Sequence, residues 1–227
     1  MSDKKTNCVI FDCEGTLVDS ERLCCEALVN IFNDLGVELT FDDVAAHFAG
    51  GKIAEILNST LELVGMSADL TLLESRYRRA VKRLLIRELQ PMEGAVHLLD
   101  TLRHHQVEFC VASNAPPKRI EFALKLAGLL PYFEGRIFSA FEANSWKPEP
   151  DLIRYCAMNM GFRLDECVYV DDTAKGVEAG VLAGVTTYQL QPLNQRNRTT
   201  YQQVVILDKI DNLSQFVVPS ERLSGAR

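Results

Sequence analysis

The sequence predicts an α/β protein: a Rossmann-like parallel sheet core with helices on both faces, interrupted after its first strand by a helical insert. Two patterns predict this fold. After Pro91, short apolar runs alternate with amphipathic helical segments, and strands joined through helices form parallel sheets with right-handed crossovers. Residues 19–87, in contrast, show helical spacing of apolar residues and no good strand.

The first strand is expected at Cys8–Phe11, since this nearly all-apolar run suits a strand that is covered on both faces. A helix is then expected to begin at Asp19 or Ser20 and to end at Gly36, because apolar residues recur along one face between these positions. The sheet is therefore interrupted immediately after its first strand.

The insert continues with three more helical segments. Thr40 can cap a short helix that Gly50 and Gly51 end. An amphipathic face at Ile53–Val64 and a long basic one at Leu70–Leu89 follow. The insert is thus predicted to be all-helical.

The second part of the chain returns to the sheet. In chain order we expect helix Ala95–Leu102, strand Val107–Ala112, helix Lys118–Ala127, strand Arg136–Ser139, helix Asp151–Met160, strand Val168–Val170, helix Lys175–Ala183, strand Thr186–Gln189 and a last strand Val204–Leu207. The tail from Val217 to Arg227 is expected to fray. Residues 1–18 and 88–227 therefore form the expected core domain, and residues 19–87 the inserted domain.

Composition narrows the classes of function. The net charge of −7 argues against nucleic acid as a partner, because phosphate backbones require clustered Lys and Arg. No apolar run approaches the roughly 18 residues of a membrane span, and Met1–Lys5 leaves no room for a signal peptide before the first strand. Seven Cys, an odd number without a C-x-x-C pair, indicate free thiols in a reducing compartment, so we expect a cytoplasmic protein.

Polar residues follow four of the predicted strands where each strand ends. They are Asp12, Glu14, Gly15 and Thr16 after the first strand, Ser113 and Asn114 after the second, Trp146, Lys147 and Pro148 after the third, and Asp171 and Asp172 after the fourth. Ligands bind at the carboxyl ends of parallel strands, so these side chains are expected to converge. Several carboxylates in one place repel each other unless a cation joins them, and Mg²⁺ is the usual cation beside phosphate.

These four sets, in this order, resemble the four motifs of the haloacid dehalogenase superfamily. The resemblance spans residues 7–190, and the insert is similar to the small helical cap of the β-phosphoglucomutase-like and 6-phosphogluconate phosphatase-like branch. It implies a phosphoric monoester hydrolase that acts on a small phosphorylated metabolite, a sugar or sugar-acid phosphate such as 6-phosphogluconate.

The resemblance also implies a role for each motif residue. Asp12 would attack phosphorus and form an aspartyl-phosphate, with Glu14 and Lys147 as further catalytic residues. Mg²⁺ would be bound by Asp12, the Glu14 main-chain carbonyl, Asp171 and Asp172. Phosphate would be bound by Thr16, Ser113, Asn114 and Lys147, and the substrate would be selected by Gly51 and Lys52 of the cap.

Glu14 departs from the family pattern, which has a second Asp two residues after the nucleophile. Glutamate carries the same carboxyl group on one more methylene, and a misplacement of about 1 Å can reduce a rate ~100-fold. Three alternatives follow: a working but slower phosphatase, a phosphoryl-binding protein with weak turnover, or an altered variant.

Other readings stay open at this point. A phosphosugar mutase shares the intermediate and returns the phosphoryl group to sugar, and the sequence separates it poorly from a phosphatase. A dehalogenase is disfavoured because Glu14 fits acid–base work. A non-catalytic protein of the same fold would be expected to lose Asp12, Lys147 or the acidic pair. We expect a monomer, with a dimer as the alternative.

Overall fold

The computed structural model describes residues 5–191, 193 and 198–218. Most of the expected frayed tail lies outside these residues; within it, Val217 and Val218 are buried. The described residues form a sheet with the strand order β3-β2-β1-β4-β5-β6, in which all pairs are parallel. The strands are β1 Cys8–Phe11, β2 Glu108–Ser113, β3 Ile137–Ser139, β4 Cys167–Asp171, β5 Thr186–Leu190 and β6 Val205–Leu207. The predicted parallel α/β core is confirmed, including the last strand.

Register brings the expected motif residues to one edge of the sheet. Strand β1 lies between β2 and β4, and Phe11 pairs with Val111 on one side and Val170 on the other. The next residue, Asp12, donates its N–H to the Val170 carbonyl at 2.9 Å. The carboxyl ends of the three central strands therefore finish side by side.

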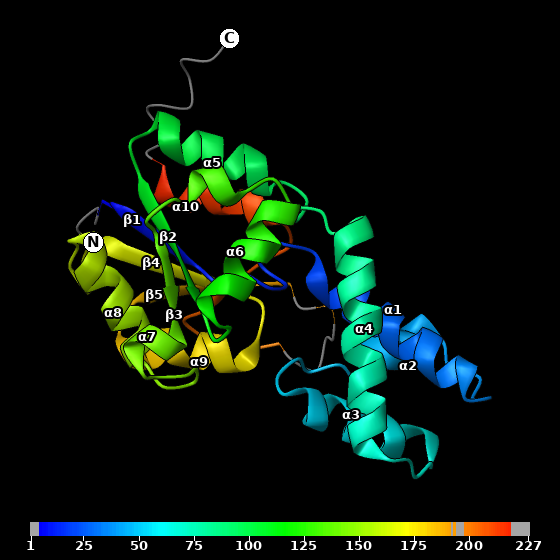
Figure 1. Cartoon of the computed structure of the whole chain (residues 1–227). Coiled ribbons are helices and arrows are strands. Elements are labelled where there is room, and N and C mark those ends of the chain that lie inside the picture. The colour runs from blue at the N-terminus through cyan, green and yellow to red at the C-terminus, as the bar shows by residue number, and fades with distance from the viewer. Residues whose placement is uncertain (1–4, 192, 194–197, 219–227) are drawn as a thin grey trace.

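Helices cover both faces of this sheet (Figure 1). Val9 and Phe11 face the cluster that includes apolar residues of α5 and α6, whereas Cys8 and Ile10 face the cluster that includes α8 and α9. The core helices are α5 Ala95–His104, α6 Pro117–Leu126, α7 Ala140–Ala143, α8 Asp151–Met160, α9 Ala174–Ala183 and α10 Ser214–Val217. Side chains alternate across a strand, so β1 is apolar throughout because both of its faces are covered.

The insert consists of helices joined by loops, and it lies beyond the carboxyl ends of the strands (Figure 1). It consists of α1 Ser20–Asp34, α2 Phe41–Ala45, α3 Ile53–Val64 and α4 Leu70–Glu88. Sequence signals fix several of these ends. The Thr40 side chain and Asp43 form a capping box at the start of α2, and Gly65 ends α3 with a φ of 65°.

Two crossing segments join the insert to the sheet, and they are bonded to each other. The Asp19 N–H donates to the Gln90 carbonyl at 3.1 Å, and the Met92 N–H donates to the Leu17 carbonyl at 2.8 Å. Between them, Val18 bridges to Pro91 and also to Glu14. The boundaries of the two domains stay a prediction, but this paired link lies where the sequence predicts them.

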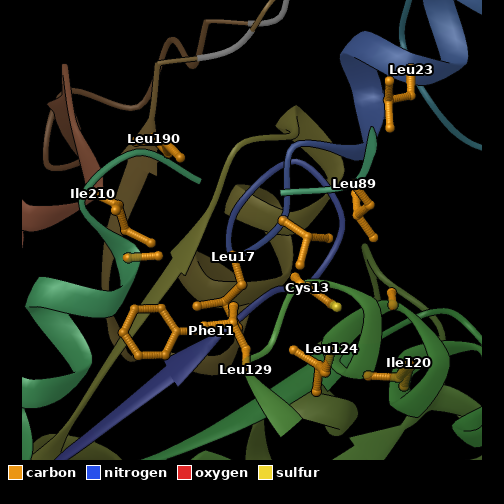
Figure 2. Packing of buried hydrophobic residues seen from close by; sticks show 14 of the residues in the cluster. Phe11, Cys13, Leu17, Leu23, Leu89, Ile120, Leu124, Leu129, Leu190 and Ile210 are labelled. Carbon is orange, nitrogen blue, oxygen red and sulfur yellow. The ribbon is translucent and has the colours of Figure 1, made fainter. Parts of the chain in front are cut away.

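The loop after β1 is anchored in the core. Cys13 and Leu17 are fully buried, and Figure 2 shows them close to Phe11 and to Ile120 and Leu124 of α6. Burial raises the pKa of the Cys13 thiol well above its ordinary value, and the neighbouring Asp12 raises it further. Cys13 therefore fills space as a neutral thiol. In the described part of the chain, no helix has the length and apolarity needed to cross a membrane.

Candidate active site

Lys147 lies at the centre of the converging strand ends. Its ammonium donates to Asp12 Oδ1 at 2.5 Å and to Asp171 Oδ2 at 2.7 Å. All three side chains are at most 8% exposed. Lys147 comes from the loop after β3 and α7, Asp12 follows β1, and Asp171 ends β4, so three chain segments meet at one ammonium group. The sequence prediction that these residues converge is confirmed by these distances.

Asp171 is held by four donors. Besides Lys147, the Tyr169 hydroxyl donates to Oδ2 at 2.5 Å. The N–H and the hydroxyl of Thr173 donate to Oδ1 at 2.8 and 2.7 Å. Hydrogen bonds of this kind to an ionised group are strong and orienting, so Asp171 and Lys147 hold each other in a defined position.

Asp172 is held from two other directions. The buried Thr16 hydroxyl donates to Asp172 Oδ1 at 2.8 Å, and the Gln189 side chain donates to the Asp172 main-chain carbonyl at 3.0 Å. Thr16 thus links the loop after β1 to the loop after β4. Its expected contact with phosphate stays a prediction.

Two glycines make room for the acidic pair. A Cβ on Gly176 would lie 1.8 Å from Asp171 Oδ2, and a Cβ on Gly15 would lie 2.5 Å from Asp172 Oδ2. Gly15 also has a φ of 85°, which favours glycine. Both carboxylates therefore lie against backbone that no other residue type could provide without displacing them.

The electrostatics of the site are dominated by buried acids. Burial raises the pKa of Asp12 to about 7, an effect that Lys147 opposes and Asp171 increases. Burial also raises the pKa of Asp172 well above its usual range, and Glu21 and Asp171 add to this. Burial alone would lower the pKa of Lys147, but Asp12 and Asp171 raise it above its ordinary value. Lys147 is therefore charged, and the raised pKa values of Asp12 and Asp172 mean that ionising all of these acids together is unfavourable without a further cation.

The acids fit a divalent cation. Asp12, Asp171 and Asp172 each offer an oxygen, and these oxygens lie within 4.8 Å of one another. Carboxylate oxygens suit hard cations, and a bound cation would offset the repulsion between these acids when they are ionised. Asp12 and Asp172 are the best-placed donors, because both oxygens of Asp171 already accept hydrogen bonds.

The second motif is bonded to the third. The Asn114 side chain accepts from the Lys147 N–H at 2.9 Å and donates to the Lys147 carbonyl at 3.3 Å. The Ser113 hydroxyl, 3% exposed as a residue, accepts from the Ala115 N–H at 3.2 Å. Asn114 therefore holds the loop of Lys147, whose peptide bond to Pro148 is cis.

Glu14 does not join the cluster around Lys147 through its side chain. Its carboxylate instead accepts from Arg119 of α6, whose Nη2 lies 2.8 Å from Glu14 Oε1. The sequence analysis did not single out Arg119. A cation in the first turn of α6 opposes the helix dipole, and this mismatch is the one sequence signal that could have indicated a specific partner for Arg119.

Two further residues of the site were missed by sequence reasoning. Glu21, in the first turn of α1, has a pKa raised to about 8 by burial, with Asp12 as the next cause. Tyr169 lies two residues before Asp171 on β4, and therefore on the same face of the strand. The sequence analysis singled out neither residue, since an acid in the first turn of a helix and an aromatic residue inside a buried strand are both common.

The expected specificity residues lie in the loop before α3. Lys52 is exposed and precedes α3, and no hydrogen bond or ion pair joins it to the motif residues within the described ranges. Its neighbour Gly50 passes close to the site, since a Cβ there would lie 3.4 Å from Glu21 Oε1. The roles of Gly51 and Lys52 stay predictions.

Comparison with known proteins identifies the family. A model of the haloacid dehalogenase-like hydrolases matches residues 6–184. The chain belongs to this family. The 6-phosphogluconate phosphatase of Escherichia coli (strain K12) is 35% identical over 180 residues, which are 79% of this chain and 80% of that protein. The predicted family resemblance is thereby confirmed, and with it the class of phosphatase-type hydrolase.

Two other comparisons add a more distant relative and a structure of the same fold. The fructose-1-phosphate phosphatase of the same organism is 26% identical over 189 residues, covering 82% of this chain and 96% of that protein. A crystal structure of a haloacid dehalogenase family hydrolase from Deinococcus radiodurans R1, with bound phosphate and sodium, superposes with a TM-score of 0.79. It shares 24% identity and covers 96% of this chain and all of that one. This haloacid dehalogenase-like hydrolase therefore shares its fold with that structure over nearly its whole length.

Proposed function

We propose that this hydrolase is a magnesium-dependent phosphatase that acts on a small sugar or sugar-acid phosphate through an aspartyl-phosphate on Asp12. The observation that carries the proposal is the contact of one Lys147 ammonium with both Asp12 and Asp171, beside Asp172. A nucleophilic carboxylate, a fixed cation and a pair of acids suited to a divalent ion are the parts that phosphoryl transfer requires.

In the proposed reaction, an Asp12 carboxylate oxygen forms a bond to phosphorus while the bond from phosphorus to the sugar oxygen breaks. Glu14 donates a proton to the leaving oxygen. A water molecule then attacks the phosphorus of the aspartyl-phosphate and gives a proton to Glu14, which restores Asp12 and releases phosphate. Splitting one displacement into two lowers each barrier.

Lys147 has two tasks in this scheme. It holds Asp12 in place, and its charge offsets the charge that develops on the transferring group. Ser113, Asn114 and Thr16 are the proposed further donors to the phosphate. Ser113 is best placed among them, because Asn114 and Thr16 already donate to Lys147 and Asp172.

A divalent ion bound here would neutralise charge between the nucleophile and the phosphate oxygens. The proposed ligands are Asp12, Asp172 and the Glu14 main-chain carbonyl, with Asp171 direct or through water. Mg²⁺ is the proposed ion because it binds through a few carboxylates together with substrate phosphate.

The substrate class rests on the relatives. A 35% identical protein is named a 6-phosphogluconate phosphatase and a 26% identical one a fructose-1-phosphate phosphatase. Both names describe a substrate that is the phosphate ester of a sugar or a sugar acid. The loop at Gly51 and Lys52, together with Glu21, is proposed to bind the hydroxyl or carboxylate groups of such a substrate.

The test is phosphate release from a panel of sugar phosphates that includes 6-phosphogluconate and fructose 1-phosphate, with Mg²⁺ or with EDTA. We expect turnover that requires Mg²⁺ and is lost in Asp12→Asn. Acid quenching of a ³²P-labelled substrate should trap label on the wild-type chain and none on Asp12→Asn. Magnesium-dependent release that survives in Asp12→Asn would refute the proposed nucleophile, and isomerisation without phosphate release would indicate a mutase.

A further inference from the structure

The side chain of Glu14 is bound by a residue outside the four motifs. Arg119 Nε lies 3.1 Å and Arg119 Nη2 lies 2.8 Å from the same oxygen, Glu14 Oε1. Glu14 is on the loop after β1 and Arg119 is in the first turn of α6, 105 residues later. Within the described residues, no hydrogen bond uses Glu14 Oε2, so this oxygen is available for proton transfer.

The backbone at both Glu14 and Arg119 is held in place by neighbouring residues. The Glu14 backbone bridges to Val18, and the next N–H, of Gly15, donates to the Val18 carbonyl at 2.9 Å. On the other side, Ile120 is 1% exposed. It packs in the cluster that includes Cys13 (Figure 2). Arg119 is therefore held next to the loop of Glu14 by the residue that follows it.

The surroundings of the guanidinium show that this contact dominates its environment. The Glu14 carboxylate is the largest influence on the pKa of Arg119 and raises it above its ordinary value, while burial opposes the rise. The other groups that act on it are Cys24 of α1 and Tyr77 of α4. The guanidinium thus lies where the loop of Glu14, α6 and the insert meet.

The length of the Glu14 side chain makes this contact possible. An aspartate on the same backbone would be one methylene shorter, which moves its oxygens back by about 1.3 Å given a carbon–carbon bond of ~1.5 Å. The distances of 2.8 and 3.1 Å would then become too long for hydrogen bonds. In its present conformation, Arg119 therefore reaches a glutamate at this position but not an aspartate.

We propose that Arg119 is a positioning residue that is matched to Glu14. It binds Oε1 and so aims Oε2 toward the leaving oxygen and the attacking water. This role rests on the proposed function, in which Glu14 transfers protons. It also accounts for the departure from the usual aspartate, because the longer side chain has its own fixed partner. Arg119 itself touches neither Asp12 nor Lys147 and acts through Glu14.

A double-mutant cycle tests the match. The variants are Arg119→Met, Glu14→Asp and the double variant, and the probes are phenyl phosphate and p-nitrophenyl phosphate. Misplacing an acid by about an ångström reduces rates ~10–100-fold, so we expect Arg119→Met to lower kcat/KM for phenyl phosphate by a factor in that range. The loss should be smaller for p-nitrophenyl phosphate, whose leaving oxygen needs less protonation. In the Glu14→Asp background, Arg119→Met should change kcat/KM by less than about threefold.

Control variants separate positioning from folding. Lys118→Met removes a cation from the neighbouring exposed position of α6 and should leave both probes unaffected. Arg119→Lys keeps one donor and should recover part of the activity, and it replaces Arg119→Met in the cycle if that variant does not fold. Thermal midpoints of all variants are measured alongside.

Each outcome decides between two conclusions. Equal losses with both probes and in both Glu14 backgrounds would mean that Arg119 has only a structural role, and a rise in KM alone would make it a substrate contact; either result overturns the proposal. Asp12→Asn is assayed in parallel. If it is inactive and the cycle shows no coupling, only the positioning role fails. If it is active, the proposed function fails and the positioning role with it.

Discussion

The hydroxyl of Tyr169 donates a 2.5 Å hydrogen bond to Asp171 Oδ2, the same oxygen that accepts from Lys147 at 2.7 Å. The Lys147 ammonium also lies 3.1 Å from the Tyr169 oxygen. Tyr169, Asp171 and Lys147 thus form a triangle in which each side chain contacts the other two. Lys147 in turn contacts Asp12. Burial raises the pKa of Tyr169 well above its ordinary value, so its hydroxyl stays a donor at every working pH.

Tyr169→Phe is therefore expected to impair catalysis without preventing folding. Losing one hydrogen bond to a charged group removes ~1.5–3 kcal/mol, and Lys147 becomes less well fixed. Activity measured as phosphate release should fall ~10-fold or more, by the same energetic argument. The matched control is Tyr188→Phe on β5, where the ring stacks on Phe216 with centroids 5.3 Å apart. Equal activities of wild type and Tyr169→Phe would mean that the triangle does not support Lys147.

Replacing Lys147 by methionine should affect stability and activity together. The variant leaves the buried carboxylates of Asp12 and Asp171 without their cation, and breaking a buried ion pair lowers the free energy of unfolding by ~3–5 kcal/mol. We expect this loss at pH 8 in EDTA, a smaller loss at pH 5, where the acids can be protonated, and partial recovery with Mg²⁺. Urea unfolding under these three conditions measures it. The prediction fails if the loss is the same at both pH values.

The residues that follow the strands could be predicted from the sequence, because all of them lie at the carboxyl ends of parallel strands. Apolar runs of strand length end at Asp12, Ser113 and Asp171, and parallel strands bring their carboxyl ends to one edge. The order of acid, hydroxyl, lysine and paired acids resembles the motifs of the haloacid dehalogenase superfamily, and the expected chemistry came from that resemblance. Asp12, Lys147 and the acidic pair were recognised in this way, and their convergence is confirmed.

Residues that reach the site from elsewhere could not be found by this rule. Glu21 and Arg119 each lie in the first turn of a helix, and the local pattern names no partner for either residue. Their place near Asp12 and Glu14 depends on how α1 and α6 pack, which no local spacing encodes. Thr16 illustrates the same limit: its position was predicted, but its bond to Asp172 depends on the approach of two loops.

Without a divalent ion, the unfolding temperature should fall as pH rises from about 5 to about 8. Glu21 has a pKa of about 8 in the folded state against an ordinary value of 4.5, and Asp12 has a pKa of about 7 against an ordinary value of 3.8. Both values are raised, so the folded protein retains protons that the unfolded chain has lost, and stability is lost as pH rises through this window. Thermal unfolding in EDTA across this range measures the effect, and Mg²⁺ should reduce the slope.

The variant Glu21→Gln tests which group causes the fall of the unfolding temperature with pH. It removes the group with the higher of the two pKa values, so the decline above pH 7 should flatten while the part due to Asp12 remains. The matched control is Glu62→Gln, which removes the same charge from an exposed position of α3 and should leave the slope unchanged. If both variants flatten the curve equally, net charge rather than the buried acids determines it.

Gly176→Ala should lower activity by displacing the Asp171 carboxylate. The new Cβ would lie 1.8 Å from Asp171 Oδ2, so the carboxylate must move and Lys147 and Tyr169 lose their common acceptor. A displacement of about 1 Å in catalytic groups reduces rates ~100-fold, and we expect at least this loss in phosphate release. The control is Gly161→Ala, where φ is 78° and no atom lies within 4 Å of the new Cβ. That variant should lose only ~1 kcal/mol of stability through backbone strain and keep its activity. If the two variants are equally active, Asp171 does not need its present position for catalysis.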